Sequence, residues 1–374
     1  MPLKLLHTAD LHLGMTFKNR NYPEDVREKL IEARVTTLER LVERANVEKC
    51  ELMIIAGDLF HRANVASEII KRTLGILNKF QGCLVLLPGN HDYYDPYGSL
   101  WPELSDRASE DFVLLTEKQP YPLHDYGIEA VLYPAPCTAK HSPQNSLEWI
   151  RDLQEKPEAC WHIGVAHGTV RGISPDFADQ YYPMADQELA SLGMNTWCLG
   201  HTHVRYPDQP EAERMPFLYC GTPEPDGFDC RHGGYAWIVE MDDHGGVFSR
   251  AIETGYFRFY ELYKQIMSRP DLEQIEHELD SSFDPQATLV KLKLVGSLPE
   301  DDYKSRRLLF DRLHEKYVYI EIDDTELTVE ITPEFISANY PQASFPHRLL
   351  SRLAERNDRE ALQIAYRLIE EVKQ

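Results

Sequence analysis

The chain has 374 residues, with 39 Lys and Arg against 61 Asp and Glu, so its formal net charge is −22 with histidine neutral. This length predicts two or three domains and allows a full core without disulfide or metal staples. No apolar run approaches the roughly 20 residues that span a bilayer, so we expect no membrane association. The start lacks a signal-peptide pattern, so we do not expect secretion by a signal peptide. A charge this negative repels polyanions, so a nucleic-acid substrate requires local positive charge from metal or from a partner.

The seven cysteines are odd in number, scattered, and never spaced as CxxC pairs. This pattern indicates neither a disulfide framework nor a zinc ribbon. We expect reduced, mostly buried thiols in a cytoplasmic protein.

Up to residue 254 the chain alternates apolar strand-like runs with helical stretches. The predicted strands are 3–7, 52–56, 83–87, 112–115, 130–133, 162–166, 196–199, 217–220, 235–241 and 247–252. Helical spacing of apolar residues predicts helices over 23–46 and 65–80. The early β-α-β order and the later hairpin-like spacing indicate that residues 1–254 form a mixed α/β sandwich.

The sequence changes character near Thr254 and Gly255, where the histidine-bearing turns stop. Residues 255–341 are expected to form a second, smaller α+β domain. Its predicted helices are 271–279 and 301–316, and its predicted strand is 289–295. Two further runs, 318–322 and 327–331, are expected to pair as a hairpin across Asp323 and Asp324.

Residues 342–374 are expected to form a third unit of two helices, 346–355 and 359–373, with Asp358 as the N-cap of the second. The second helix carries an apolar stripe. The stripe either closes the protein's own core or docks a partner helix, and the sequence leaves both readings open.

Five turns that directly follow apolar runs carry side chains able to bind metal. They are TADLH (8–12), GDLFH (57–61), GNHD (89–92), AHG (166–168) and GHTH (200–203). Ligand sites in α/β sheets gather outside the carboxyl ends of the strands. We therefore expect seven side chains to converge at one rim: Asp10, His12, Asp58, Asn90, His167, His201 and His203.

The chemistry of this set suits a pair of divalent cations. Two carboxylates, one amide oxygen and four imidazoles, without a thiolate, favour Mn²⁺, Fe²⁺ or Zn²⁺ over Ca²⁺. The DxH and HxH spacings place both side chains on the same side of an extended backbone. Asp58, with two carboxylate oxygens, is the expected bridge. Each motif alone is commonplace, and the prediction depends on the occurrence of all five in order.

The series TADLHLG, GDLFH, PGNHD, AHG and GHTH resembles the five-motif signature of the calcineurin-like metallophosphoesterases. Within that superfamily the chain is most similar to the SbcD-type DNA repair exonuclease subunits, including the YhaO-like bacterial nucleases. The N-terminal TADLHLG, the histidine directly after GDLF, and GTPEP (Gly221–Pro225) carry this similarity. The resemblance implies a four-layer αββα sandwich with a smaller α+β capping domain and a C-terminal helical segment.

The resemblance also implies roles for single residues. Asp10, His12, Asp58 and His203 would hold one metal, and Asp58, Asn90, His167 and His201 the other, with Mn²⁺ expected first and Mg²⁺, Fe²⁺ or Zn²⁺ as alternatives. His91 is implied as the general acid, Asp92 as the residue that orients it, and His61 as a non-ligand histidine near the scissile phosphate. Two ions about 3.5–4 Å apart lower the pKa of a shared water and neutralise phosphoryl charge. Imidazoles titrate near neutrality and can protonate a departing alkoxide.

Three functions stay open. The first is a metal-dependent DNA nuclease, a duplex-end exonuclease and single-strand endonuclease acting in DNA repair or defence. In the family, such proteins pair with an SbcC-like SMC-type ATPase and often form homodimers. The second is a phosphatase or phosphodiesterase on nucleotides or phosphoproteins, which the acidic charge favours. The third is an interaction subunit that mainly docks the ATPase. The extra domain favours the nuclease, because a minimal phosphatase has no need of it.

Overall fold

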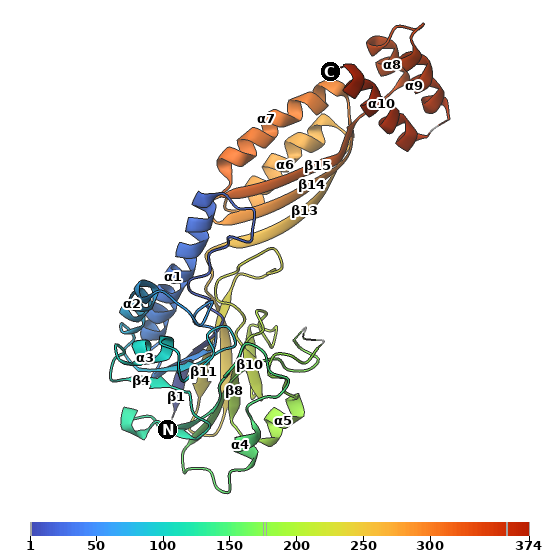
Figure 1. The fold of residues 1–374 in the computed structure, drawn as a ribbon. Coiled ribbons are helices and arrows are strands. Elements are labelled where there is room, and N and C mark those ends of the chain that lie inside the picture. Colours follow the sequence, from blue (N-terminus) through green and yellow to red (C-terminus); the bar gives the residue numbers. More distant parts are fainter. Residues whose placement is uncertain (1, 175, 177, 357, 374) are drawn as a thin grey trace. The chain divides into compact units, whose positions relative to one another are not determined.

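The computed structural model describes residues 2–174, 176, 178–356 and 358–373. The chain divides between Arg258 and Phe259 into two compact units, which are described separately (Figure 1). Within the described ranges, no helix has the length and apolar character needed to cross a membrane.

The first unit contains a seven-stranded sheet. In spatial order its strands are β4 (Phe112–Leu114), β3 (Cys83–Leu87), β2 (Leu52–Ala56), β1 (Leu3–Thr8), β11 (Tyr235–Met241), β12 (Val247–Glu253) and β9 (Glu211–Glu213). The strands β1 to β4 are parallel, whereas β11 pairs antiparallel with β1. The parallel strands are connected through α1 (Glu24–Val47), α2 (Ser67–Leu77) and α3 (Leu100–Ser105). Every residue of β2 and β3 is buried, as their unbroken apolar sequence predicts.

A second sheet of five strands belongs to the same unit. Its order is β10 (Phe217–Tyr219), β8 (Thr196–Gly200), β7 (Trp161–His167), β6 (Ala130–Ala135) and β5 (Tyr121–Pro122). Only the β5–β6 pair is antiparallel. The short elements η1 (His124–Tyr126), α4 (Glu148–Arg151) and α5 (Asp186–Ser191) lie between these strands in sequence.

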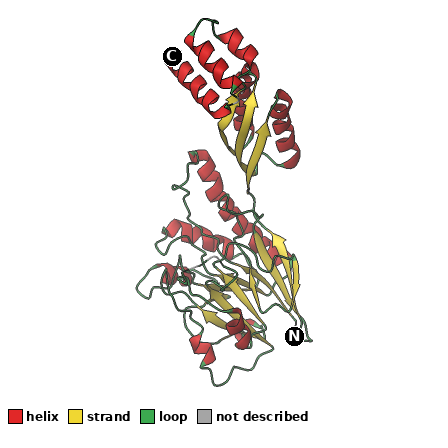
Figure 2. Cartoon of the chain, turned by 90° about the vertical axis from the view of Figure 1, so that its right-hand side faces the viewer, coloured by secondary structure: helices red, strands yellow, loops and turns green. Residues whose placement is uncertain are grey.

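Three apolar clusters define the layers of the first unit. One cluster joins the facing sides of the two sheets, for example Ile54 of β2 with Ile163 of β7. A second joins the outer side of the seven-stranded sheet to α1, α2 and α3. A third joins the outer side of the five-stranded sheet to α4 and α5. The order helix, sheet, sheet, helix confirms the predicted four-layer αββα sandwich, whose strands and helices are distinguished by colour in Figure 2.

The second unit contains a sheet with the order β13 (Arg258–Ile266), β14 (Thr288–Leu298) and β15 (Tyr319–Val329). The helices α6 (Arg269–Ser282) and α7 (Glu300–Lys316) pack on one face of this sheet, as Figure 1 shows. The result is an α+β unit, as expected.

The hairpin expected across Asp323 and Asp324 is wrong. The two runs form the single strand β15, which pairs parallel with β14 over its whole length. The register shifts between Lys293 and Val295, so the two strands stay paired across an irregularity at the acidic pair. Asp324 is held by Arg306 Nε of α7 at 2.8 Å. A turn-like sequence therefore lies within a strand because a bulge and an ion pair accommodate it.

Three helices end the chain: α8 (Pro333–Asn339), α9 (Phe345–Glu355) and α10 (Arg359–Lys373). Thr332 and Ser344 cap the first two, since each side-chain oxygen accepts a backbone N–H two or three residues into its helix. The helices share a small core that includes Ile336, Leu350 and Leu362. They belong to the same compact unit as the three-stranded sheet, and the division of this unit at residue 341 stays a prediction.

Candidate metal centre

The seven expected ligands follow the carboxyl ends of five strands that belong to both sheets. Asp10 and His12 follow β1, Asp58 follows β2, and Asn90 follows β3. His167 is the last residue of β7, and His201 and His203 follow β8. The structure brings all seven together, and it buries five of them; His201 and His203 remain half-buried. The rim predicted from the sequence is therefore present, and the roles of its residues remain proposals.

Asp10, His12 and His203 form one group of side chains. His12 Nε2 lies 3.1 Å from His203 Nε2, and His203 Nε2 lies 3.9 Å from Asp10 Oδ1. The Asp58 carboxylate is adjacent, with Oδ2 3.7 Å from His12 Nε2. One donor atom from each of Asp10, His12 and His203 lies within 4.8 Å of the others, as a shared cation requires.

Asp58, Asn90, His167 and His201 form the other group. Asn90 Oδ1 lies 3.0 Å from His167 Nε2 and 2.9 Å from His201 Nδ1. Asp58 Oδ2 lies 3.5 Å from His167 Nε2. The same Asp58 oxygen therefore faces a histidine of each group, which is the arrangement that a bridging carboxylate needs.

Backbone contacts orient this second group. His167 Nδ1 donates to the carbonyl oxygen of Ala56 at 2.8 Å, which leaves Nε2 free to face the centre. Asn90 Nδ2 donates to the carbonyl oxygen of Lys140 at 3.3 Å, so that Oδ1 is the atom presented to the histidines. A hydrogen-bonded outer shell of this kind is typical of metal ligands.

The ligand turns adopt strained backbone conformations. Four non-glycine residues of the set have positive φ: Asp10 at 55°, His12 at 47°, Asp58 at 53° and His201 at 97°. Such conformations cost about 1–3 kcal/mol each and persist where surrounding contacts hold them. Here the N–H groups of Asp10 and His12 donate to the carbonyls of Gly57 and Asp58, at 3.1 and 2.9 Å, and so join the first two turns.

The donor set fits divalent cations. Buried carboxylates need compensating positive charge, and burial, together with the neighbouring Asp58 carboxylate, raises the pKa of Asp10. For Asp58, burial is outweighed by His167 and His12, which hold its pKa well below the ordinary value. The Asp58 carboxylate in turn raises the pKa of His167 to about 9 against the effect of burial. Oxygen and imidazole donors that face one another in this way are the mixed set expected for transition-metal dications.

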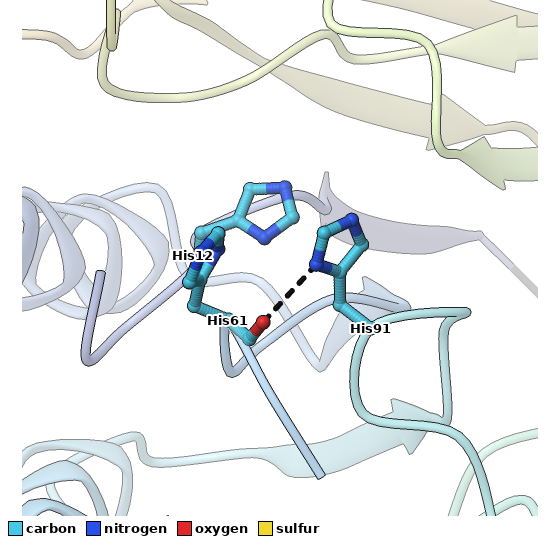
Figure 3. A group of neighbouring side chains, drawn as sticks. All are labelled: His12, His61 and His91. Carbon is cyan, nitrogen blue, oxygen red and sulfur yellow. Dashed lines mark hydrogen bonds between the residues drawn. The ribbon is translucent and has the colours of Figure 1, made fainter. Parts of the chain in front are cut away.

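Two further histidines, His61 and His91, lie beside the two groups and close to His12. The rings of His12, His61 and His91 have centroids 4.8–5.5 Å apart (Figure 3). His91 Nδ1 lies 3.1 Å from the carbonyl oxygen of His61, the contact drawn as a dashed line in Figure 3. When Nδ1–H donates to this oxygen, Nε2 is left as the atom that exchanges a proton. Burial and the neighbouring His91 lower the pKa of His61 to about 4, so His61 is neutral at neutral pH.

Asp92 has partners that differ from those expected. Its carboxylate is fully buried and accepts hydrogen bonds from the backbone N–H groups of Phe60 at 2.9 Å and Gly89 at 2.8 Å. The group bonded to the His91 ring is instead the His61 carbonyl. Asp92 thus joins the second and third turns and acts on His91 only through the backbone, because a buried carboxylate takes the nearest N–H donors.

Sequence reasoning missed two charged residues beside the centre, Arg34 and Asp226. Both are buried, and Arg34 Nη2 lies 3.3 Å from Asp226 Oδ2. The sequence pattern could have indicated that Arg34 is buried, because Arg34 lies four residues from both Leu30 and Leu38, within the apolar stripe of α1. A charged residue at such a position requires a buried partner.

The αββα fold and the clustered carboxylate, amide and imidazole donors are the features of a phosphoesterase with candidate metal-binding groups. The family model of the calcineurin-like phosphoesterases matches residues 3–205. The chain belongs to the calcineurin-like phosphoesterase family, whose members hydrolyse phosphoesters with divalent metals.

Three relatives illustrate the similarity. The uncharacterized metallophosphoesterase YhaO of Bacillus subtilis is 27% identical over 231 residues, which cover 59% of this chain and 52% of YhaO. The DNA double-strand break repair protein Mre11 of Methanopyrus kandleri is 26% identical over 277 residues, covering 68% of this chain and 58% of Mre11. The SbcD component of the SbcCD nuclease of Staphylococcus saprophyticus is 31% identical over 109 residues, covering 28% of this chain and 27% of SbcD. The chain thus spans little more than half the length of the first two relatives.

Proposed function

We propose that the protein is a two-metal-dependent DNA nuclease that hydrolyses phosphodiester bonds. The observation that carries the proposal is the convergence of seven oxygen and nitrogen donors in two groups that share Asp58, with His91 and His61 at their side. Two of the three relatives described above are named as a DNA repair protein and as part of a nuclease.

The chain's own residues supply the remaining parts of the reaction. The two donor groups would hold a pair of divalent ions, and bound ions of this kind would supply an activated water and positive charge opposite the phosphate. His91 holds the proton that the leaving oxygen needs, because the His61 carbonyl keeps Nδ1 engaged and leaves Nε2 for exchange. His61 is neutral and offers a hydrogen bond to a phosphate oxygen rather than a charge.

A nucleic-acid substrate is favoured by aromatic surface beside the centre. The Tyr181 ring lies 4.9 Å from the ring of His201 and 5.0 Å from that of His141. Tyr181 is half-buried and His141 is exposed. Aromatic side chains can stack on nucleobases, so their position beside the donor groups favours a substrate that carries bases.

The C-terminal helices support an SMC-like ATPase as the partner. On α10, Ile364, Leu368 and Val372 are spaced by four residues and are 51%, 56% and 88% exposed. Leu362 of α10 is buried in the core that the three C-terminal helices share. The three exposed residues lie on another side of α10 and form a second apolar stripe. An apolar stripe on a helix is the kind of surface that the heptad positions of a coiled coil recognise.

The test of this function is a comparison of substrates with the purified full chain and Mn²⁺. We expect degradation of a linear duplex, loss of that activity with EDTA, and recovery when Mn²⁺ is restored in excess. Asp58→Asn, which removes the shared charge, should abolish cleavage with every substrate. Cleavage of single-stranded circles would identify the endonuclease component.

A metal-dependent phosphatase or phosphodiesterase on nucleotides or phosphoproteins is the second candidate, and the net charge of −22 favours it. Rapid turnover of p-nitrophenyl phosphate or of a mononucleotide, combined with an intact duplex, would decide for this candidate and against the nuclease.

A further inference from the structure

The segment Thr222–Cys230 contacts the ligand turns without contributing a proposed ligand. Thr222 N donates to the His203 carbonyl oxygen at 3.1 Å, and Thr222 Oγ1 donates to the Asp10 carbonyl oxygen at 3.0 Å. Residues 222–225 of this segment belong to the GTPEP motif, to which the proposed mechanism assigns no role. Its first residue therefore joins the first and the last of the five turns.

Asp226, in the same segment, faces a ligand from its outer side. Its Oδ2 lies 3.9 Å from His203 Nδ1, while the other ring nitrogen, Nε2, faces His12. Its Oδ1 accepts from Cys230 Sγ at 3.4 Å. His203, Asp226 and Cys230 are themselves close enough for one donor atom of each to lie within 4.8 Å of the others.

Arg34 of α1 holds this carboxylate. Its Nη2 lies 3.3 Å from Asp226 Oδ2, and its Nη1 donates to the carbonyl oxygen of Leu11 at 2.6 Å. Leu11 is the residue between Asp10 and His12. The guanidinium-bearing residue is 2% exposed and the carboxylate-bearing residue 6% exposed, so the pair is shielded from water and salt. Against the effect of burial, Arg34 keeps the pKa of Asp226 below its ordinary value, and the carboxylate stays charged.

We propose that Asp226, held by Arg34, is a positioning residue for His203 and sets the affinity of one of the two metal sites. The inference rests on the proposed metal centre. At 3.9 Å the Asp226 carboxylate acts on His203 Nδ1 electrostatically, which favours the tautomer with the proton at Nδ1 and leaves Nε2 as the metal donor. Arg34 adds a second connection, because it also holds the turn that carries Asp10 and His12.

The effect is specific to one site because the two donor groups have separate outer contacts. His167 is oriented by the Ala56 carbonyl and Asn90 by the Lys140 carbonyl. Of the two donor groups, the one that the described contacts of Asp226 reach is the group that contains His203. Its loss is therefore expected to weaken one site and to spare the other.

The experiment is a calorimetric titration of Mn²⁺ into the EDTA-treated and desalted full chain. For Asp226→Asn, which keeps the shape and removes the charge, we expect the dissociation constant of one site to rise about 10–100-fold and that of the other to stay within about twofold. Glu224→Gln is the matched control. Glu224 is buried in the same segment, but its carboxylate accepts from Thr37 and from the N–H groups of Tyr256 and Phe257, so both metal affinities should persist.

Arg34→Met provides a second test in case Asp226→Asn folds poorly. Arg34→Met should weaken the same site, and the double variant should lose less than the sum of the two single losses, since both act on His203. Two unchanged sites in a folded Asp226→Asn variant, or an equal weakening of both sites, would overturn the inference alone. A folded wild-type chain that takes up no Mn²⁺ would overturn the proposed centre itself.

Discussion

The two histidines that follow GDLF and GN are proposed to have different tasks because their surroundings differ. His61 is neutral, since burial and a neighbouring imidazole lower its pKa to about 4. His91 is tied at Nδ1 to the His61 carbonyl and keeps Nε2 for proton exchange. We therefore propose that His91 donates the proton and that the neutral His61 donates a hydrogen bond.

His91→Ala tests the proton-donor role. With a DNA substrate, whose leaving alkoxide needs a proton, kcat should fall about 100-fold to 10,000-fold. With bis-p-nitrophenyl phosphate, whose leaving group departs unprotonated, the loss should be much smaller. Metal content measured by mass spectrometry should stay at the wild-type level. A loss of bound metal would show that His91 is a ligand.

Tyr181→Ala tests the nucleic-acid reading of the site. A base–aromatic stack contributes about 1–3 kcal/mol, so KM for DNA should rise about 10-fold while kcat/KM for bis-p-nitrophenyl phosphate stays unchanged. Tyr126→Ala is the matched control, because Tyr126 is half-buried and precedes the amino end of β6, remote from the rim. Equal losses on both substrates would assign Tyr181 a structural role.

His7 predicts a pH dependence of stability. It is fully buried, and burial lowers its pKa to about 3. The folded state therefore keeps the ring neutral, whereas the unfolded chain protonates it below about pH 6.5, so stability is lost as the pH falls. Between pH 7.5 and 5 the loss attributable to His7 is about 2 kcal/mol. Urea unfolding of His7→Leu in EDTA should lack this part of the slope, and the exposed control His244→Gln should retain it.

The sequence predicted which residues converge at the rim because each ligand type carries its own chemistry and follows a recognisable apolar run. The sequence could not predict which hydrogen-bond partner each of these side chains has in the fold. Asp92 looked suited to orient His91, yet the fold gives its oxygens to two backbone N–H groups. The positive φ values of Asp10, His12, Asp58 and His201 likewise depend on contacts between turns far apart in the chain.

At the scale of elements, long periodic segments were predictable and short ones were not. The helix α1 and the buried strands β2 and β3 match their sequence patterns closely. The helices α3, α4 and α5 have only four to six residues, too few for a period to show. The continuous strand β15 was misread because two aspartates usually mark a turn, and only tertiary pairing with β14 overrides that preference.

The exposed stripe of α10 predicts a docking contact. Leu368→Glu places a charge in its middle, and affinity for the proposed SMC-like ATPase should fall about 30-fold, the effect of losing about 2 kcal/mol at a hot spot. Arg367→Glu introduces the same group one residue away, off the stripe, and should have a small effect. Metal content and nuclease activity without the ATPase should be unchanged in both. Equal affinity in the two variants would place the docking surface elsewhere.

For the whole molecule, the net charge of −22 opposes the approach of DNA. The two proposed ions add positive charge only at the centre, which acts at short range, whereas the acidic surface acts at a distance. This contrast predicts that long-range repulsion limits encounter at low salt and that a partner which supplies positive surface relieves it.

The measurement is the salt dependence of kcat/KM on duplex DNA for the chain alone. Between about 10 and 100 mM ionic strength the Debye length falls from about 30 to about 10 Å, so the rate constant should rise as repulsion is screened. The rate with bis-p-nitrophenyl phosphate, which carries a single charge, should change little. A steady decline of kcat/KM on DNA would instead indicate a basic DNA path that outweighs the total charge.

Glu224 fixes the point at which the chain leaves the first unit. Its carboxylate holds the N–H groups of Tyr256 and Phe257, and Thr37 of α1 holds the carboxylate. Two residues earlier, Thr222 donates hydrogen bonds to the carbonyl oxygens of Asp10 and His203. Thr222, Pro223 and Glu224 are consecutive in the chain, so a force applied beyond Phe257 would reach the turns that carry the proposed ligands through three residues.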